Sequence, residues 1–142
     1  HDSKMNFTLA ALAHDCMEAI GAPRFTEEEK AYARQVAQAV GLPGVEGELD
    51  ESILPVDGTI KKDNGSSDVA DVSQIVPVVN INTACYGRKT PNHSWAVTVQ
   101  ADKPAAHRGM LFAAKTLALM GTRLATEPTL LAAVRAEFEQ AE

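Results

Sequence analysis

Hydrophobic residues recur at helical spacing in two segments of the N-terminal third of the chain. The first predicted helix begins near Thr8 and ends at Gly21, and its apolar side consists of Leu9, Leu12, Ala13, Cys16 and Ile20. The second follows Thr26, which has the capping-box spacing to Glu29, and runs to Gly41. We therefore expect two amphipathic helices joined by a short connection.

The C-terminal third predicts two more helices. A long helix is expected from about Ala105 to Leu124, with one apolar face made of Met110, Ala113, Ala114, Leu117, Gly121 and Leu124. Thr126 is expected to cap a last helix that has Pro128 in its first turn. The inward side of this last helix is predicted to be Leu130, Leu131, Val134 and Phe138.

The middle of the chain has the patterns of loops and strands. Residues 42–68 are rich in Gly and Pro and predict irregular chain with one strand candidate at residues 53–56. Residues 76–81 are β-branched and nearly continuous, and residues 94–100 alternate between apolar and polar positions, so both are predicted strands. The order of helices and strands predicts an α/β fold in which helices cover a sheet.

Composition and charge narrow the functional classes. The 142 residues and 45% hydrophobic content suit one domain or a piece of one. A net charge of -6 argues against a nucleic-acid or anionic-membrane partner, because both need clustered Lys and Arg. The two cysteines, Cys16 and Cys85, have no disulfide or zinc-knuckle spacing, and a reducing cytoplasmic location is expected.

His93 is the first candidate for chemistry. It follows Pro91 and Asn92 and precedes the predicted strand at residues 94–100, a constrained place that suits a metal ligand. Asp68 or Asp71 would then fix its second ring nitrogen. The alternatives are a loop histidine bonded to backbone, and two aspartates that cap a helical turn.

A polar loop supplies the second candidate. Its residues Gly65, Ser66, Ser67 and Asp68 have the composition of a tight loop that could hold a substrate carboxylate, or of a plain turn. Tyr86 and Trp95 are candidates to wall a pocket for an aromatic substrate, although aromatic residues more often lie in cores and interfaces.

Taken in order, several motifs carry a resemblance to a known family. They are Gly21-Ala22-Pro23-Arg24-Phe25-Thr26-Glu27-Glu28-Glu29, Gly65-Ser66-Ser67-Asp68-Val69-Ala70-Asp71-Val72-Ser73, Val76-Pro77, Ala84-Cys85-Tyr86, Pro91-Asn92-His93-Ser94-Trp95 and Ala106-His107-Arg108-Gly109-Met110. This series resembles the p-aminobenzoyl-glutamate hydrolase-like amidohydrolases, in the dinuclear metallopeptidase family that includes aminoacylases and glutamate carboxypeptidases. The resemblance implies that residues 1–142 are the C-terminal portion of one three-layer catalytic domain, with helices on a mixed sheet and without the lid or dimerisation domain.

The resemblance also implies a site. His93 matches the family's last metal ligand, and the loop from Gly65 to Asp68 lies near the substrate. Two zinc or manganese ions would serve hydrolysis of an N-acyl amino acid such as aminobenzoyl-glutamate. The other ligands and the general base have no match here, so no catalytic residue is assigned and the chain alone is expected to be inactive.

Two hypotheses for the chain's role follow from this incomplete set of residues. As a fragment of an amidohydrolase, it is expected to self-associate or to pair with the missing part of the catalytic domain, because a partial sheet leaves unpaired edges. The alternative is a stand-alone α/β binding or interaction module without catalysis.

Overall fold

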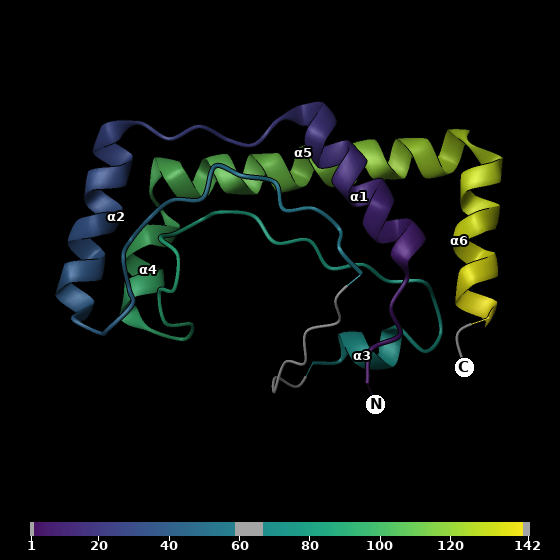
Figure 1. Cartoon of the computed structure of the whole chain (residues 1–142), viewed down its shortest axis with the longest axis horizontal. Helices are drawn as coiled ribbons and strands as arrows, with labels where there is room; N and C mark the ends of the chain where they lie inside the picture. The colour runs from purple at the N-terminus through teal and green to yellow at the C-terminus, as the bar shows by residue number, and fades with distance from the viewer. Residues whose placement is uncertain (1, 59–66, 141–142) are drawn as a thin grey trace. The chain divides into compact units, whose positions relative to one another are not determined.

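The computed structural model describes residues 2–58 and 67–140. In this part of the chain the helices are α1 (Phe7–Ile20), α2 (Glu27–Val40), α3 (Val69–Val72), α4 (Trp95–Ala101), α5 (Pro104–Thr126) and α6 (Pro128–Gln140), as Figure 1 shows. The chain divides into two compact units. The first unit comprises His1–Ala19, Leu54–Ile81 and Thr116–Glu142, and the second comprises Ile20–Ile53 and Asn82–Lys115. That residues 1–142 belong to one catalytic domain stays a prediction.

The α/β prediction, with helices packed on a mixed sheet, is wrong for this structure. The described residues contain no strand, and residues 95–101 form helix α4 instead. Ala96 and Gln100 are four residues apart and both buried, which is helical spacing. The Gln100 side chain donates to the Ala96 carbonyl over 2.8 Å and accepts the Gly87 N–H over 3.1 Å. Burial at this spacing, with a satisfied carboxamide, outweighs the strand propensity of the valines.

The other two strand candidates do not form strands. Residues 53–56 and residues 76–81 contain no strand, although both have β-type sequences. Strand propensity measures how side chains fit on a pleated surface against neighbouring strands. Since no described segment offers such a neighbour, the propensity has nothing to act on.

The first unit has a core of aliphatic, cysteine and methionine side chains. Its buried residues are Leu9, Leu12, Ala13, Cys16, Met120 and Val134. Asn6 fixes the start of α1 by accepting the Leu9 N–H over 2.9 Å and donating to the Val134 carbonyl over 3.0 Å. The carboxylate of Glu137 accepts the N–H groups of Phe7 and Thr8. The predicted apolar side of the first helix is therefore confirmed, apart from Ile20, which is only partly buried.

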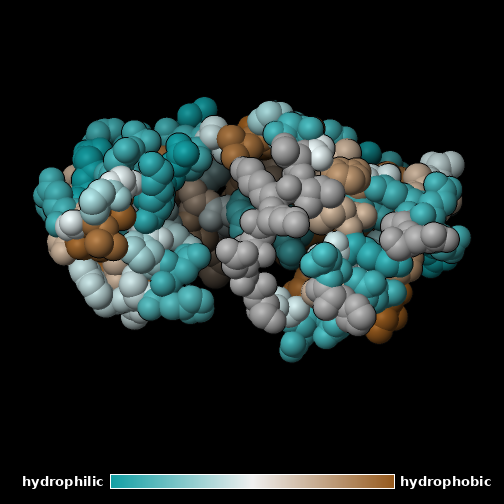
Figure 2. Space-filling view, turned by 60° about the horizontal axis from the view of Figure 1, so that its bottom comes forward, coloured by the Kyte–Doolittle hydropathy of each residue, from teal (hydrophilic) through white to brown (hydrophobic). Residues whose placement is uncertain are grey.

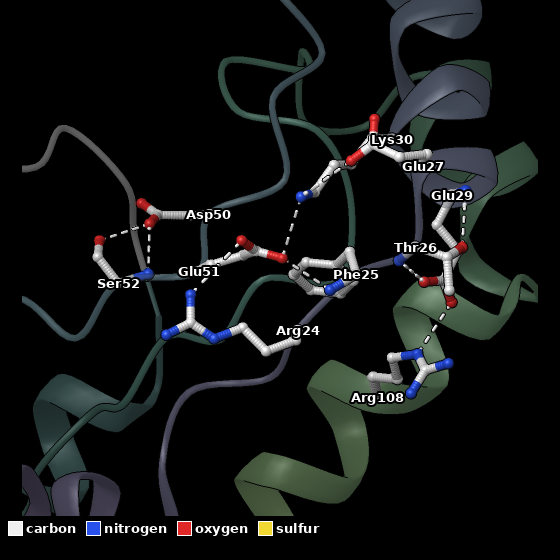
Figure 3. A network of polar contacts seen from close by, with 10 residues as sticks. All are labelled: Arg24, Phe25, Thr26, Glu27, Glu29, Lys30, Asp50, Glu51, Ser52 and Arg108. Carbon is white, nitrogen blue, oxygen red and sulfur yellow. Dashed lines mark hydrogen bonds and ion pairs between the residues drawn. The ribbon is translucent and has the colours of Figure 1, made fainter.

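The second unit relies on small residues and polar contacts. Its core consists of Phe25, Ala33, Leu49 and Ala105. The predicted capping box is confirmed: Thr26 and Glu29 exchange their backbone and side-chain hydrogen bonds at the start of α2. Glu29 also accepts a hydrogen bond from Arg108 of α5 over 2.9 Å, as Figure 3 shows.

The predicted apolar face of α5 is wrong in two of its largest members. Met110 and Leu117 are 57% and 56% exposed, whereas Ala105, Ala106, Phe112, Thr116 and Met120 are buried. Gly109 explains which side of α5 packs inward in the second unit. It lies so close to the Ala84 carbonyl that a Cβ at this position would collide with it. Close approach of small residues, rather than hydrophobicity, decides which side faces inward here.

The end of α5 also differs from expectation. Thr126 is the last residue of α5 and donates its hydroxyl to the Thr122 carbonyl, so it does not cap α6.

Some apolar side chains remain on the surface. Figure 2 shows hydrophobic side chains at the surface of the molecule in brown. No helix in the described residues is both long and apolar enough to cross a membrane.

Candidate functional site

An open pocket of about 700 Å³ lies in the second unit, around the start of α4. Its lining residues are Tyr86, Asn92, His93, Ser94, Trp95, Val97 and Thr98. The structure thus brings together three candidates from the sequence, His93, Tyr86 and Trp95. Tyr86 lies before the loop that leads into α4, His93 lies within this loop, and Trp95 is the first residue of the helix.

Two buried polar residues hold this loop in place. The Gln100 carboxamide accepts the Gly87 N–H, and the buried Thr90 donates its hydroxyl to the Gly87 carbonyl over 2.6 Å. Ser94 closes the turn by donating to the Pro91 carbonyl over 2.6 Å. Neither Gln100 nor Thr90 was predicted from the sequence. The available signal was a glutamine four residues after Ala96 in an otherwise apolar segment, which is typical of a satisfied amide on a helix.

The backbone at His93 is in the left-handed region, with a φ of 57°. This conformation costs a residue with a Cβ about 1–2 kcal/mol, so the surrounding hydrogen bonds must hold it there. The His93 side chain is exposed, and no described residue forms a hydrogen bond with its imidazole. Neither ring nitrogen of His93 is therefore bonded to another residue in the part of the chain that the structure describes.

The two aromatic side chains line the same pocket. Tyr86 donates its hydroxyl to the Asn92 side-chain oxygen over 3.0 Å. Trp95, the first residue of α4, is 53% exposed. It is thus not a core residue, which was one of the two alternatives, core or interface, for an aromatic residue in the sequence.

The lining of the pocket contains no Asp, Glu, Lys or Arg. In residues 2–58 and 67–140, no group of three or more His, Cys, Asp and Glu side chains could hold a metal ion. One imidazole is too few for a zinc or manganese site, which takes at least three protein ligands in known catalytic centres. The described residues therefore do not form a complete metal site, and His93 as a metal ligand stays a prediction.

The predicted substrate loop is only partly described. Gly65 and Ser66 lie outside the described residues, and Ser67 and Asp68 precede α3 in the first unit. The Ser67 hydroxyl accepts the Val69 N–H over 3.2 Å, and Asp68 occupies the cap position without a side-chain cap bond. Contact of this loop, or of Asp71, with His93 or a substrate stays a prediction.

A second, charged pocket of about 500 Å³ in the same unit was not predicted. It is lined by Lys30, Arg34, Glu48, Leu49, Asp50, Glu51, Ser52 and Arg88. Glu51 accepts the Phe25 N–H over 2.7 Å and pairs with Lys30 at 3.3 Å and Arg24 at 3.6 Å (Figure 3). The Phe25 hydrogen bond, helped by the Lys30 ammonium, holds the pKa of Glu51 below its usual value. The available signal was Lys30 and Arg34 at i,i+4 spacing on a predicted helix.

Comparisons with known proteins identify a relative. No family model matches the chain. No solved structure matches it either. The chain is 28% identical over 158 residues to a subunit of p-aminobenzoyl-glutamate hydrolase from Escherichia coli (strain K12), and the match covers 95% of this chain and 33% of that protein. The chain thus spans about a third of the relative's length. This match confirms, at the level of the family, the resemblance to the p-aminobenzoyl-glutamate hydrolase-like amidohydrolases that the motifs predicted.

Proposed function

We propose that the chain supplies part of the active site of a metal-dependent amidohydrolase, which cleaves the amide bond of an N-acyl amino acid such as aminobenzoyl-glutamate. One observation carries the proposal. The histidine that the resemblance selects, His93, is exposed in an open pocket beside Tyr86 and Trp95, with an imidazole that no described residue bonds. The name of the E. coli relative supports the substrate class.

In this proposal His93 is one imidazole ligand of a zinc or manganese ion. The remaining ligands and the general base come from outside the described residues, since those residues do not complete a metal site. The chain's own contribution is to hold His93 in the left-handed backbone conformation and to wall the pocket with two aromatic side chains. Ser67 and Asp68, with Gly65 and Ser66, are proposed to orient the substrate.

The proposal includes an assembled state, in the cytoplasm, with a second copy or with the rest of the catalytic domain. Several large apolar side chains of the first unit are exposed, among them Leu54, Ile75 and Val76. Exposed apolar residues of this size support an interface on that unit. A single, monodisperse monomer by light scattering would contradict this part of the proposal.

The first test replaces His93 by Ala in the protein that carries this chain. We expect the variant to lose hydrolysis of aminobenzoyl-glutamate at least about 100-fold, and to retain less zinc or manganese after purification, because a metal ligand is removed. Hydrolysis is followed by the release of aminobenzoate, and metal content by elemental analysis. Full activity together with full metal content in the variant would contradict the assignment of His93.

A matched control is His14→Ala. His14 lies on α1 in the first unit and does not line the pocket. We expect this variant to keep wild-type activity and metal content. If the wild-type protein itself neither hydrolyses acyl amino acids nor binds metal, the alternative of a binding or interaction module replaces the proposal.

A further inference from the structure

We infer that the charged pocket of about 500 Å³ in the second unit binds a free α-amino acid, with Arg34 at the ligand's carboxylate and Glu48 at its ammonium group. This pocket shares no lining residue with the pocket of His93. An N-acyl amino acid has no ammonium group, so the ligand differs from the substrate class proposed above. The inference therefore does not depend on the proposed function.

Most charged groups of this pocket are already engaged with other residues of the chain. Asp50 accepts hydrogen bonds from the N–H and the hydroxyl of Ser52, as Figure 3 shows, and its other oxygen lies 4.0 Å from Arg88. The bonds from Ser52 hold the pKa of Asp50 below its usual value. Glu51 is held by Lys30 and by a backbone N–H. These contacts stabilise the walls of the pocket.

Arg34 and Glu48 are the charged lining residues without such a contact. Neither side chain forms a hydrogen bond or an ion pair with another residue in the described part of the chain. They do not pair with each other either, although they have opposite charges and line one pocket. One cationic and one anionic group thus remain for a ligand, and a molecule that has both charges complements them better than an anion or a cation alone.

The backbone fixes where these two side chains begin. Gly47 packs so tightly on α2 that a Cβ on it would lie 2.8 Å from the Arg34 Cα, and Glu48 is the next residue. The Glu48 carbonyl accepts the Arg88 N–H over 2.7 Å, and Leu49 after it is buried in the core of the unit. The main chain at Arg34 and at Glu48 is therefore in place before a ligand binds, which lowers the entropic cost of binding.

The pocket also has the size and an apolar surface for a ligand of this class. Its volume of about 500 Å³ is in the range of small-molecule sites. Leu49 lines it, and the methylene groups of Lys30 and Arg34 add apolar surface beside their charged ends. An amino acid with an aliphatic side chain suits this combination of charges and apolar surface.

The experiment compares three probes that differ in their charged groups. They are L-leucine, N-acetyl-L-leucine, which has no ammonium group, and L-leucinamide, which has no carboxylate. Each is titrated at about pH 6.5, where free amines are protonated, into the ¹⁵N-labelled 142-residue chain. The amide resonances of residues 48–52 report binding at the pocket. We expect L-leucine to bind at least about 5-fold more tightly than either other probe, because each of those lacks one charged contact.

Two variants make the test specific for the proposed pairs. Arg34→Gln should abolish the preference for L-leucine over L-leucinamide and keep the preference over N-acetyl-L-leucine. Glu48→Gln should abolish the preference over N-acetyl-L-leucine and keep the preference over L-leucinamide. Both side chains are exposed and unbonded among the described residues, so we expect both variants to fold, and their amide spectra establish this.

Matched controls come from the first unit. Arg135→Gln and Glu139→Gln make the same chemical changes at exposed positions of α6 that line neither of the two pockets. We expect these variants to keep the wild-type affinities for all three probes.

The inference is overturned if L-leucine shifts none of the resonances of residues 48–52, or if either other probe binds as tightly as L-leucine. Unchanged preferences in Arg34→Gln and Glu48→Gln would also overturn it. The His93→Ala variant should bind L-leucine as the wild type does. Failure of the proposed function and failure of this inference can therefore be told apart.

Discussion

The two units of the chain are stabilised by different kinds of contact. In the first unit, α1, α6 and the end of α5 bury leucine, methionine, valine and cysteine side chains against one another. The core cluster of the second unit includes two alanines, Ala33 and Ala105, and glycine at positions 47, 87 and 109 lets backbone segments approach closely. The pocket with His93 and Trp95 lies in this second unit.

The difference shows which kind of contact holds the loop that forms the pocket. A loop that exposes a histidine and a tryptophan cannot be held by burying them. Hydrogen bonds from the buried Gln100 and Thr90 do this instead, because a satisfied buried polar group fixes one geometry. We therefore expect the first unit to be sensitive to loss of side-chain volume and the second to be sensitive to added volume and lost polar partners.

The largest effect is expected for Leu12→Ala in the first unit. Leu12 is 2% exposed in the apolar core, so truncation removes buried surface and leaves a cavity. We expect the free energy of unfolding to fall by about 2–5 kcal/mol. Urea denaturation, with amide exchange of α1 and α6 to locate the loss, measures this effect.

The matched control for that variant is Leu54→Ala in the same unit. Leu54 is 70% exposed, and the same chemical change there should alter the free energy of unfolding by no more than about 0.5 kcal/mol. Equal losses for both leucines would show that burial of Leu12 does not stabilise the first unit.

The second largest effect is expected for Gly109→Ala, which tests close packing in the second unit. The added Cβ would collide with the Ala84 carbonyl and approach the Cys85 sulfur at 2.7 Å. We expect destabilisation by about 1–3 kcal/mol, although alanine favours the helix itself. Thermal unfolding followed by Trp95 fluorescence reports on this unit.

Gly121→Ala is the control on the same helix. A Cβ at Gly121 meets no atom within 4 Å, so only the gain in helix propensity remains. We expect stabilisation by about 0.5–1 kcal/mol. If both glycine variants were stabilising, close approach at Gly109 would not limit packing in the second unit.

The long helices could be predicted from the sequence because their signals are local. The capping box of Thr26 and Glu29, and the apolar spacing from Leu9 to Cys16, are complete within one or two helical turns. Whether a sheet forms could not be predicted from such local signals. Residues 76–81 have strand propensity, yet a strand exists only if a distant segment pairs with it, and no described segment does.

The residues of the candidate site also differ in whether a local sequence signal marks them. Tyr86 and Trp95, which the sequence made candidates to wall a pocket, line one together with His93, whereas the role of His93 as a metal ligand stays a prediction. Gln100 and the second pocket were missed, because their role depends on partners such as Gly87 and Glu51 that lie 13 or more residues away. Residues whose function is to hold others have weak local signals.

The smallest effect is expected for Glu51→Gln, which tests the polar contacts of the second unit. The Phe25 N–H and the Lys30 ammonium lower the pKa of Glu51 below its usual 4.5. A carboxyl group with a lowered folded-state pKa stabilises the protein above its unfolded-state pKa, and this contribution is lost as pH falls through the folded-state value. Wild type should therefore exceed the variant in melting temperature at pH 7, and the difference should shrink below pH 4.5.

A matched variant in the first unit serves as the control for the Glu51 test. Glu127→Gln removes a carboxylate that pairs with Arg123 at 2.8 Å and accepts no backbone N–H among the described residues. An i,i+4 ion pair of this kind contributes little and is screened by salt, so its pH-dependent difference should be smaller and should vanish in about 1 M salt. The Phe25 N–H carries no net charge, so salt does not screen this hydrogen bond as it screens an ion pair, and the Glu51 difference should persist in salt. If both differences vanished together, long-range charge rather than the Phe25 hydrogen bond would be what Glu51 contributes to the second unit.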